Sequence, residues 1–316
     1  MKALIVYNPY AKKNRVIKKL KYIKETLSKE YETIDLYASQ GIRSITSYVM
    51  NNVNNYDLLV ISGGDGTVNE AISGVVLAKS KVPLAIIPSG TVNDLAKLLG
   101  YSKNIKRNLR IIMYGTNASM DVCKINDRYF TYACACGKYT DVSYTARRGF
   151  KRILGRLAYF FEGVHEFVKY TKMDLKITFD EQFIQDRFYV IFGLNTNRVA
   201  GFKIDKKSKI KLNDGLIDLT LIDKSRVSWP KLLKFFLFGN HTRKGIRTFK
   251  ASNIEIESKE LINVNTDGEL AFTSDYIKIN VLKEIINVRI SRRIKRELFI
   301  KNNTKWLRNS KLHSVN

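Results

Sequence analysis

The sequence is poor in proline, cysteine and tryptophan, and it has no long uninterrupted apolar run. Only four prolines occur in 316 residues, and no low-complexity linker divides the chain. Its cysteines lack the paired spacing of zinc ligands and are odd in number, which argues against a disulfide framework and predicts reduced packing residues: Cys123, Cys134 and Cys136. No stretch approaches the roughly 20 apolar residues of a spanning helix. Any contact with a membrane is therefore expected at its surface.

Acidic residues are scarce relative to basic ones. The 29 aspartates and glutamates face 55 lysines and arginines, which gives a formal net charge of +26. Such an excess predicts attraction to a polyanion, whether nucleic acid, an anionic membrane face or a polyphosphate ligand. Three scattered histidines show no ligand spacing and are expected to be surface or packing residues: His165, His241 and His313.

The N-terminal part alternates between apolar strands and helices. Strands are predicted at 3–8, 33–39, 57–62 and 83–88, and helices at 15–29, 43–54, 67–79 and 91–99. The strands are continuous apolar runs, as expected for a parallel sheet covered on both faces. Residues 1–120 are therefore predicted to form a doubly wound α/β domain. The short apolar run before Asn8 is too brief for a signal peptide, so a cytoplasmic protein is expected.

The rhythm changes after about residue 120. Segments rich in β-branched and aromatic residues, separated by Asn, Asp and Gly, predict a β-sandwich domain over 121–289. One helix is expected within it at 150–172. The segment 228–245 reads as an amphipathic helix that either lies in a lipid interface or packs on the second domain. The basic segment 290–316 is expected to pack back on the first domain or to form a basic tail.

A glycine-rich stretch, "ISGGDGTVNE", follows the third strand. Gly63, Gly64 and Gly66 would let a phosphate approach the backbone, and Thr67 would cap the next helix and offer a hydroxyl. Asp65 suits a contact with an anion only through Mg²⁺ or its waters. The alternative is an ordinary turn in which Asp65 is a capping residue.

The fourth strand ends in a similar way, in "IIPSGTVNDLAKLLG". Gly90 and Thr91 follow the strand, and Asn93 and Asp94 open a helix. In open parallel sheets, ligands collect beyond the carboxyl ends of the strands. Two further loops end at the same edge, at Asn8-Pro9 and at Ser39.

These two motifs together resemble the catalytic domain of the diacylglycerol and sphingosine lipid kinases, especially the soluble bacterial diacylglycerol kinases. The similarity continues in order through "MDVCKINDRYF", "TNRVAGF", "KLNDGLIDL" and "NVNTDGEL", which covers nearly the whole chain except the tail. "GGDGT" alone also occurs in NAD kinases and phosphofructokinases, so the ordered set carries the resemblance. It implies a two-domain kinase with ATP at the sheet edge and lipid between the domains.

The resemblance also implies roles for individual residues. The nucleotide would be lined by Asn8, Pro9, Ser39, Gly63, Gly64, Asp65, Gly66, Thr67, Asn69, Glu70, Gly90, Thr91 and Asn93. Asp267 would be the general base, while Glu269, Asp65 and Asp94 would hold a magnesium–water network. A structural Mg²⁺ would be bound by the Asp214 side chain and by the carbonyls of Lys211 and Leu216.

Two positions leave alternatives open. Asp267 lies in an Asp-Gly pair, which is also common in hairpin turns, and is expected to be exposed and mobile. The first loop reads "NPYAKKN", where the family usually has a small residue and glycine after Asn-Pro. Tyr10 and Lys12 would then supply a hydroxyl and a charge to the phosphates.

The leading interpretation is an ATP- and Mg²⁺-dependent kinase that converts diacylglycerol to phosphatidic acid on the inner face of the cell membrane. A sphingoid base, an isoprenoid alcohol or NAD are alternative acceptors, and a non-catalytic basic protein that binds membrane or nucleic acid is a third interpretation. No RNA-reading motif is visible. Anionic phospholipid is the expected partner of basic groups that otherwise form a solvated face: Lys151, Arg152, Arg156, Arg292, Arg293, Lys295 and Arg296. A homodimer is compatible with the resemblance, although no residue pattern requires it.

Overall fold

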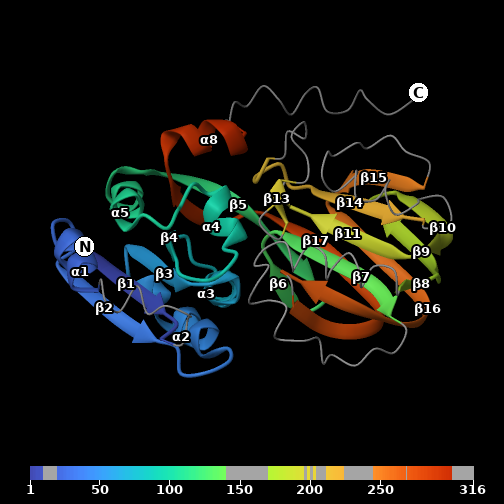
Figure 1. Cartoon of the computed structure of the whole chain (residues 1–316), viewed down its shortest axis with the longest axis horizontal. Helices are drawn as coiled ribbons and strands as arrows, with labels where there is room; N and C mark the ends of the chain where they lie inside the picture. The colour runs from blue at the N-terminus through green and yellow to red at the C-terminus, as the bar shows by residue number, and fades with distance from the viewer. Residues whose placement is uncertain are drawn as a thin grey trace, which may run out of the picture.

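The structure is a computed structural model, and it describes residues 1–9, 20–139, 170–195, 198–199, 202–203, 211–223, 245–267 and 269–300 (Figure 1). Several predictions lie outside these ranges. They concern most of the helix at 150–172, nearly all of 228–245, the tail from 301, and the side chains of Tyr10, Lys12, Lys151, Arg152, Arg156, His165, His241 and His313.

The N-terminal lobe is built on four parallel strands. They are β1 (Lys2–Tyr7), β2 (Thr33–Ala38), β3 (Leu58–Gly63) and β4 (Pro83–Pro88), in the order β2-β1-β3-β4. The apolar runs of β1, β3 and β4 are buried because both faces of the sheet are covered. This arrangement confirms the predicted doubly wound α/β fold.

Helices connect these strands. They are α1 (Leu20–Leu27), α2 (Ser44–Asn52) with the 3-10 turn η2 (Val53–Asn55), α3 (Asp65–Leu77), α4 (Asp94–Leu98) and α5 (Ile105–Tyr114). Helix α1 contacts α5, whereas α2 packs against α3. Figure 1 shows α5 and the α2–α3 pair on opposite sides of the strands. Helix α5 was not predicted, although its sequence buries Leu109 and Ile112 on one face and the Asn104 side chain caps its first turn.

The C-terminal lobe is rich in antiparallel strands, which confirms the predicted β-sandwich. They are β5 (Thr116–Ile125), β6 (Arg128–Phe130), β7 (Ala133–Tyr139), β8 (Tyr170–Thr171), β9 (Met173–Phe179), β10 (Gln182–Phe188), β11 (Val190–Leu194), β12 (Arg198–Val199), β13 (Phe202–Lys203), β14 (Ile217–Ile222), β15 (Ile246–Ala251) and β16 (Asn253–Thr266). The helix expected at 150–172 was wrong at its end, because Tyr170 and Thr171 pair with β7.

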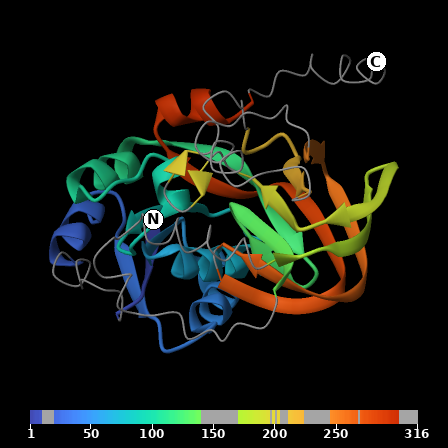
Figure 2. The same ribbon diagram turned by 45° about the vertical axis from the view of Figure 1, so that its right-hand side comes forward.

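One long strand joins the two lobes. Strand β17 (Glu269–Ile290) pairs with β16 and β5 in antiparallel fashion, and near its end it pairs with β4 in parallel. An irregularity between Leu282 and Ile286 lets the strand change partners. Figure 2 shows β17 running from the sandwich toward the N-terminal lobe.

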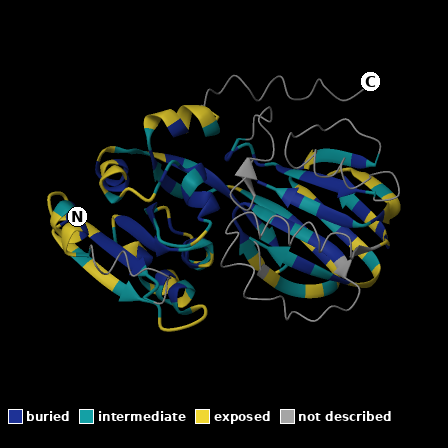
Figure 3. Ribbon diagram, in the orientation of Figure 1, coloured by how far each residue is buried: buried dark blue, intermediate teal, exposed yellow. Residues whose placement is uncertain are grey.

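The final described helix returns to the first lobe. Helix α8 (Arg292–Leu298) follows β17, and Ile294 and Phe299 are buried in the same apolar cluster as the strands of the N-terminal lobe. A second cluster fills the sandwich. Figure 3 shows buried residues along the strands of both lobes and exposed residues on the outer side of α8.

Candidate active site

The carboxyl ends of the parallel strands are tied together by backbone hydrogen bonds. Ser39 N–H donates to the Tyr7 carbonyl (2.8 Å), Asn8 N–H donates to the Ser62 carbonyl (3.1 Å), and Ser89 N–H donates to the Gly63 carbonyl (2.9 Å). The loops after β1, β2, β3 and β4 therefore meet at one edge of the sheet, as predicted from the sequence.

The two glycine motifs touch at their backbones. A Cβ on Gly90 would lie 2.5 Å from the Cα of Gly64, and a Cβ on Gly63 would lie 2.3 Å from the Cβ of Thr67. The first distance excludes a side chain at Gly90 unless the two loops move apart. The second excludes one at Gly63 unless Thr67 shifts. The glycines thus permit close packing of the two loops as well as access to the backbone.

No side chain of the described residues caps the first turn of helix α3. Gly64 is its N-cap residue and provides no side-chain cap, so the first turn of this 13-residue helix is open to an external acceptor. The expectation that Thr67 caps the helix was wrong, because Thr67 lies inside the first turn and is buried. Gly66 in that turn is exposed, as is Thr91 on the neighbouring loop.

Asp65 clamps the second loop. One carboxylate oxygen accepts the Asn93 N–H at 2.7 Å and the other accepts the Asp94 N–H at 2.8 Å, where α4 begins. Burial raises the pKa of Asp65, and these hydrogen bonds act in the opposite direction. Asp65 is thus a capping residue, as the alternative interpretation held, although it caps α4 rather than its own helix.

Asn93 shapes the same loop. It adopts a left-handed conformation (φ 55°), and its side-chain amide bonds both the N–H and the carbonyl of Gly90, at 2.9 and 2.7 Å. Asp94 follows it in the first turn of α4 and is almost completely buried. The Asn93 side chain therefore serves the loop itself in this conformation.

Asp267 is tightly held. Its carboxylate accepts hydrogen bonds from the Thr131, Tyr132 and Ala133 N–H groups (3.0–3.2 Å) and from Asn69 Nδ2 (2.6 Å). The expectation of an exposed and mobile side chain was therefore wrong. Burial raises the pKa of Asp267, and the hydrogen bonds from Thr131, Asn69, Tyr132 and Ala133 oppose that shift.

Asn69 connects the lobes. It projects from α3, and its amide nitrogen also donates to the Tyr129 carbonyl (3.2 Å) while Ser73 Oγ donates to its oxygen (3.3 Å). Asn69 therefore reaches the carboxylate of the other lobe from the helix whose N-terminus faces the sheet edge. Glu70 beside it has a buried Oε2 with no hydrogen-bond partner in the described part of the chain. Glu269 begins β17 opposite Thr266.

The loop 211–216 meets a lysine from β15. Leu216 N–H donates to Asp214 Oδ1 (3.2 Å), and Lys250 Nζ lies 3.5 Å from Asp214 Oδ2 and 3.7 Å from Asp218 Oδ1. No cluster of three metal-ligating acids, histidines or cysteines occurs among the described residues. The half-buried Asp214 carboxylate fits a cation by charge, but Lys250 already supplies part of that charge.

Sequence reasoning missed Asp121. Its buried carboxylate accepts the Gly215 N–H (2.6 Å) and the Glu284 N–H (2.7 Å), which ties the loop 211–216 to the irregular part of β17. Burial raises the pKa of Asp121 to about 6, with a further increase from the charge of Asp214. The signal was an acidic residue between two apolar ones, Met120 and Val122, within the motif "MDVCKIN" of a predicted strand.

Comparison with known proteins identifies the family. Residues 2–125 match the model of the diacylglycerol kinase catalytic domain, and residues 137–288 match the YegS C-terminal NAD kinase β-sandwich-like domain. A diacylglycerol kinase of Staphylococcus aureus strain RF122 is 33% identical over 85% of this chain and 86% of its own length. The chain belongs to the diacylglycerol kinase family. It is therefore an enzyme of the lipid kinase class.

Other members of the diacylglycerol kinase family agree. The diacylglycerol kinase of Staphylococcus saprophyticus is 31% identical over 85% of this chain and 88% of its own. A crystal structure from Bacillus anthracis strain Sterne, also described as a diacylglycerol kinase, has a TM-score of 0.80. Its sequence is 25% identical, over 93% of this chain and 96% of that chain. A second structure from that strain, described as a diacylglycerol kinase, is 23% identical over 93% of this chain and 98% of its own (TM-score 0.74) and shows the shared fold.

Proposed function

We propose that the protein phosphorylates the hydroxyl of diacylglycerol with ATP and Mg²⁺ to give phosphatidic acid. The observation that carries this proposal is the 2.6 Å hydrogen bond between Asn69 and Asp267. It links the helix that begins at the glycine motif to a carboxylate of the other lobe. A phosphate at one end of α3 and an acceptor hydroxyl at the other lobe would thus be held by connected residues.

The phosphates of ATP would lie against the start of α3. Its uncapped N–H groups and the helix dipole favour an anion, and the exposed Gly66 and Thr91 leave the backbone accessible. The other nucleotide-lining residues would be those at the same edge: Asn8, Pro9, Ser39, Gly63, Gly64, Asp65, Thr67, Asn69, Glu70, Gly90 and Asn93. Mg²⁺, when bound with ATP, would neutralise charge on the transferred phosphoryl group.

Asp267 would act as the general base. A carboxylate whose pKa is raised by burial is a better proton acceptor than one in water, and its five hydrogen-bond donors fix its position. The lipid hydroxyl would donate its proton to Asp267 as its oxygen attacks the terminal phosphorus of ATP. The bond from that phosphorus to the bridging oxygen would break, and ADP would leave. Asp65, Asp94 and Glu269 would hold the waters of the metal.

A second Mg²⁺ would bind the loop 211–216 through Asp214 and the carbonyls of Lys211 and Leu216. Its contribution would be structural, because this loop is tied to β5 and β17 through Asp121. Lys250 would have to move or share the carboxylate when the ion binds.

Transfer of labelled phosphate from ATP to lipid tests the function. We expect diacylglycerol to be labelled in preference to a sphingoid base, an isoprenoid alcohol or NAD. Asp267→Asn should lower kcat by at least about a hundredfold, the usual range for loss of a general base. Its Tm is measured beside kcat, because the new Nδ2 would face N–H donors that now bind a carboxylate oxygen. Asp127→Asn, at an exposed turn, is the control with the same chemical change. Absence of labelled lipid with every acceptor contradicts the proposal.

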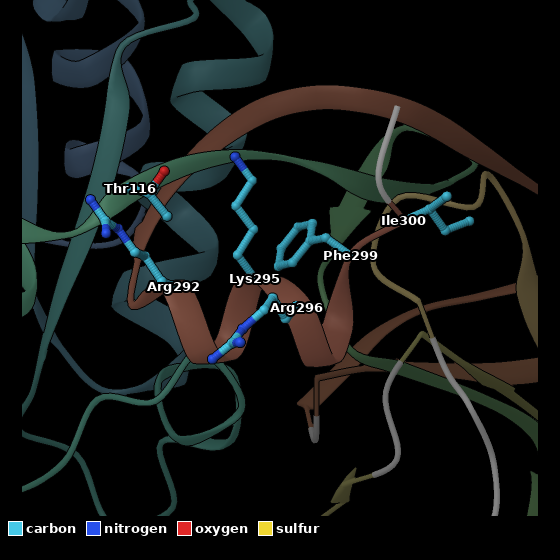
Figure 4. Close-up of a pocket in the computed structure, with 6 residues that line it drawn as sticks. All are labelled: Thr116, Arg292, Lys295, Arg296, Phe299 and Ile300. Atoms are coloured by element: carbon cyan, nitrogen blue, oxygen red, sulfur yellow. The ribbon is translucent and has the colours of Figure 1, made fainter. Parts of the chain in front are cut away.

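The enzyme would reach its lipid from the membrane surface on the cytoplasmic side. No helix in the described residues is long and apolar enough to cross a bilayer. A cavity of about 530 Å³ lies between α8 and β5 and combines three cationic side chains with an apolar floor: Thr116, Arg292, Lys295, Arg296, Phe299 and Ile300 (Figure 4). No carboxylate of the described residues pairs with Arg292 or Arg296. Such a surface suits anionic phospholipid.

A further inference from the structure

One buried side chain is left without hydrogen bonds. Asn195, directly after β11, is only 1% exposed, and neither its Oδ1 nor its Nδ2 has a partner in the part of the chain that the structure describes. Asn108 in α5 is equally buried, but its amide is paired with Ser102 at both atoms (2.8 and 3.0 Å). A buried amide without hydrogen bonds lowers the stability of the folded protein. Such a side chain is therefore a candidate for a group that binds a ligand.

Asn195 lies beside the segment that holds Asp267. Its N–H donates to the Tyr132 carbonyl (3.0 Å), and the Tyr132 N–H donates to Asp267 Oδ1 (3.1 Å). Asp267 N–H in turn donates to the Ala133 carbonyl (2.8 Å). Asn195 and Asp267 thus flank Tyr132–Ala133 from opposite sides, about two strand spacings or ~10 Å apart along the sheet.

The chain beyond Asn195 crosses toward the nucleotide lobe. Strand β12 (Arg198–Val199) contacts α4, the helix whose first N–H groups are capped by Asp65. Figure 2 shows the short β12–β13 strands beside α4. Asn195 is therefore on the other side of Tyr132–Ala133 from the candidate base and only three residues from a strand that contacts the nucleotide lobe.

We propose that Asn195 is a substrate-binding residue that hydrogen-bonds the glycerol headgroup of the lipid acceptor next to Asp267. A carboxamide offers one acceptor and two donors, which matches a headgroup with a hydroxyl and neighbouring ester carbonyls. The headgroup would satisfy an amide that the described part of the chain leaves unpaired. This inference rests on the proposed function and names a further group of the same site.

The test compares Asn195→Leu with Asn108→Leu, because both replace a buried amide by an apolar group of the same branching. We expect Asn195→Leu to keep or raise the Tm, while Asn108→Leu lowers it by breaking paired hydrogen bonds. In the kinase assay, Asn195→Leu should lower kcat/KM for diacylglycerol about tenfold or more and leave the KM for ATP unchanged. Asn195→Ala, which adds no volume, should show the same split between the two substrates.

Three outcomes would overturn the inference. If Asn195→Leu lowers the Tm as much as Asn108→Leu does, the amide has a structural partner, such as a buried water. Unchanged kcat/KM for diacylglycerol would show that it does not touch the substrate. An equal loss for both substrates would indicate a general disturbance of the site. If the wild-type enzyme labels only another lipid, the proposed acceptor fails, and the same comparison is then made with that lipid.

Discussion

At the scale of single residues, the glycines of the two strand-end motifs are needed for packing as well as for phosphate access, and the motifs alone do not show this. Gly64 and Gly90 come from different loops, and their backbones lie in contact at the sheet edge. The motif predicted access for phosphate, whereas the structure shows that the same absence of side chains lets two loops close on each other. Asp65 then fixes that arrangement through the N–H groups of Asn93 and Asp94.

Substituting Gly90 by alanine tests this contact. The new Cβ would lie 2.5 Å from the Gly64 Cα and 2.9 Å from Asn93 Oδ1, so the loops must separate. We expect a loss of about 1–3 kcal/mol in the free energy of unfolding, typical of overpacking. The KM for ATP should rise, because the first turn of α3 moves with the loop. Denaturant titration and steady-state kinetics measure the two effects, and a KM equal to that of the wild type contradicts the prediction.

At the scale of elements, the ammonium group of a lysine from β15 contacts the acidic side chain of the loop 211–216. Lys250 on β15 lies between Asp214 and Asp218, at 3.5 and 3.7 Å, and both partners are largely shielded from solvent. A divalent cation binding at Asp214 has to compete with this ammonium group. If the loop binds Mg²⁺ as proposed, Lys250 would weaken its affinity for the ion.

Lys250→Met should expose this competition. We expect the variant to bind Mg²⁺ about three- to tenfold more tightly than the wild type, since one nearby positive charge is removed from a partly exposed site. The Mg²⁺ dependence of the Tm, measured without nucleotide, reports the affinity. Asp214→Asn should abolish the dependence, and Lys259→Met, on an exposed stretch of β16, is the matched control. Equal affinities in Lys250→Met and the wild type would remove Lys250 from this role.

At the scale of the whole molecule, β17 makes the two lobes into one hydrogen-bonded sheet. The strand begins beside Asp267, pairs with the sandwich, and ends against β4 of the nucleotide lobe. Helix α8 then returns to the first core through Ile294 and Phe299. The exposed bases of α8 are thereby held in a fixed position relative to the active site.

Vesicle binding tests the role of this surface. Replacing Arg292 and Arg296 by glutamine should weaken binding to vesicles that contain anionic phospholipid. We expect the binding free energy at low salt to fall by about 2 kcal/mol, or some thirtyfold in affinity, as measured by sedimentation with the vesicles. Activity on lipid in detergent micelles should remain. Lys21→Gln with Lys24→Gln, on the exposed face of α1, removes the same charge elsewhere. Equal losses for the two pairs would indicate a general effect of net charge, and binding to neutral vesicles would indicate another mode of contact.

The sequence by itself determined the order of strands and helices in the first lobe, the β-rich second lobe and the edge of the sheet at which polar loops collect. These follow from local patterns, because apolar runs, glycines and helix starts depend on near neighbours in the chain. The prediction left out α5, although its amphipathic sequence, with bases on the exposed face, is a local signal of the same kind.

Only the tertiary structure decided which distant groups meet. Asn69 reaches Asp267 across 198 positions, and Asp121 bonds Gly215 and Glu284. The buried side-chain amide of Asn195 finds no partner among the residues that the structure describes. Asp267 was expected to be mobile because a turn motif carries no information about the strand packed beside it. Hydrogen bonds of this kind depend on strand register and on the docking of the lobes, which no local stretch of residues specifies.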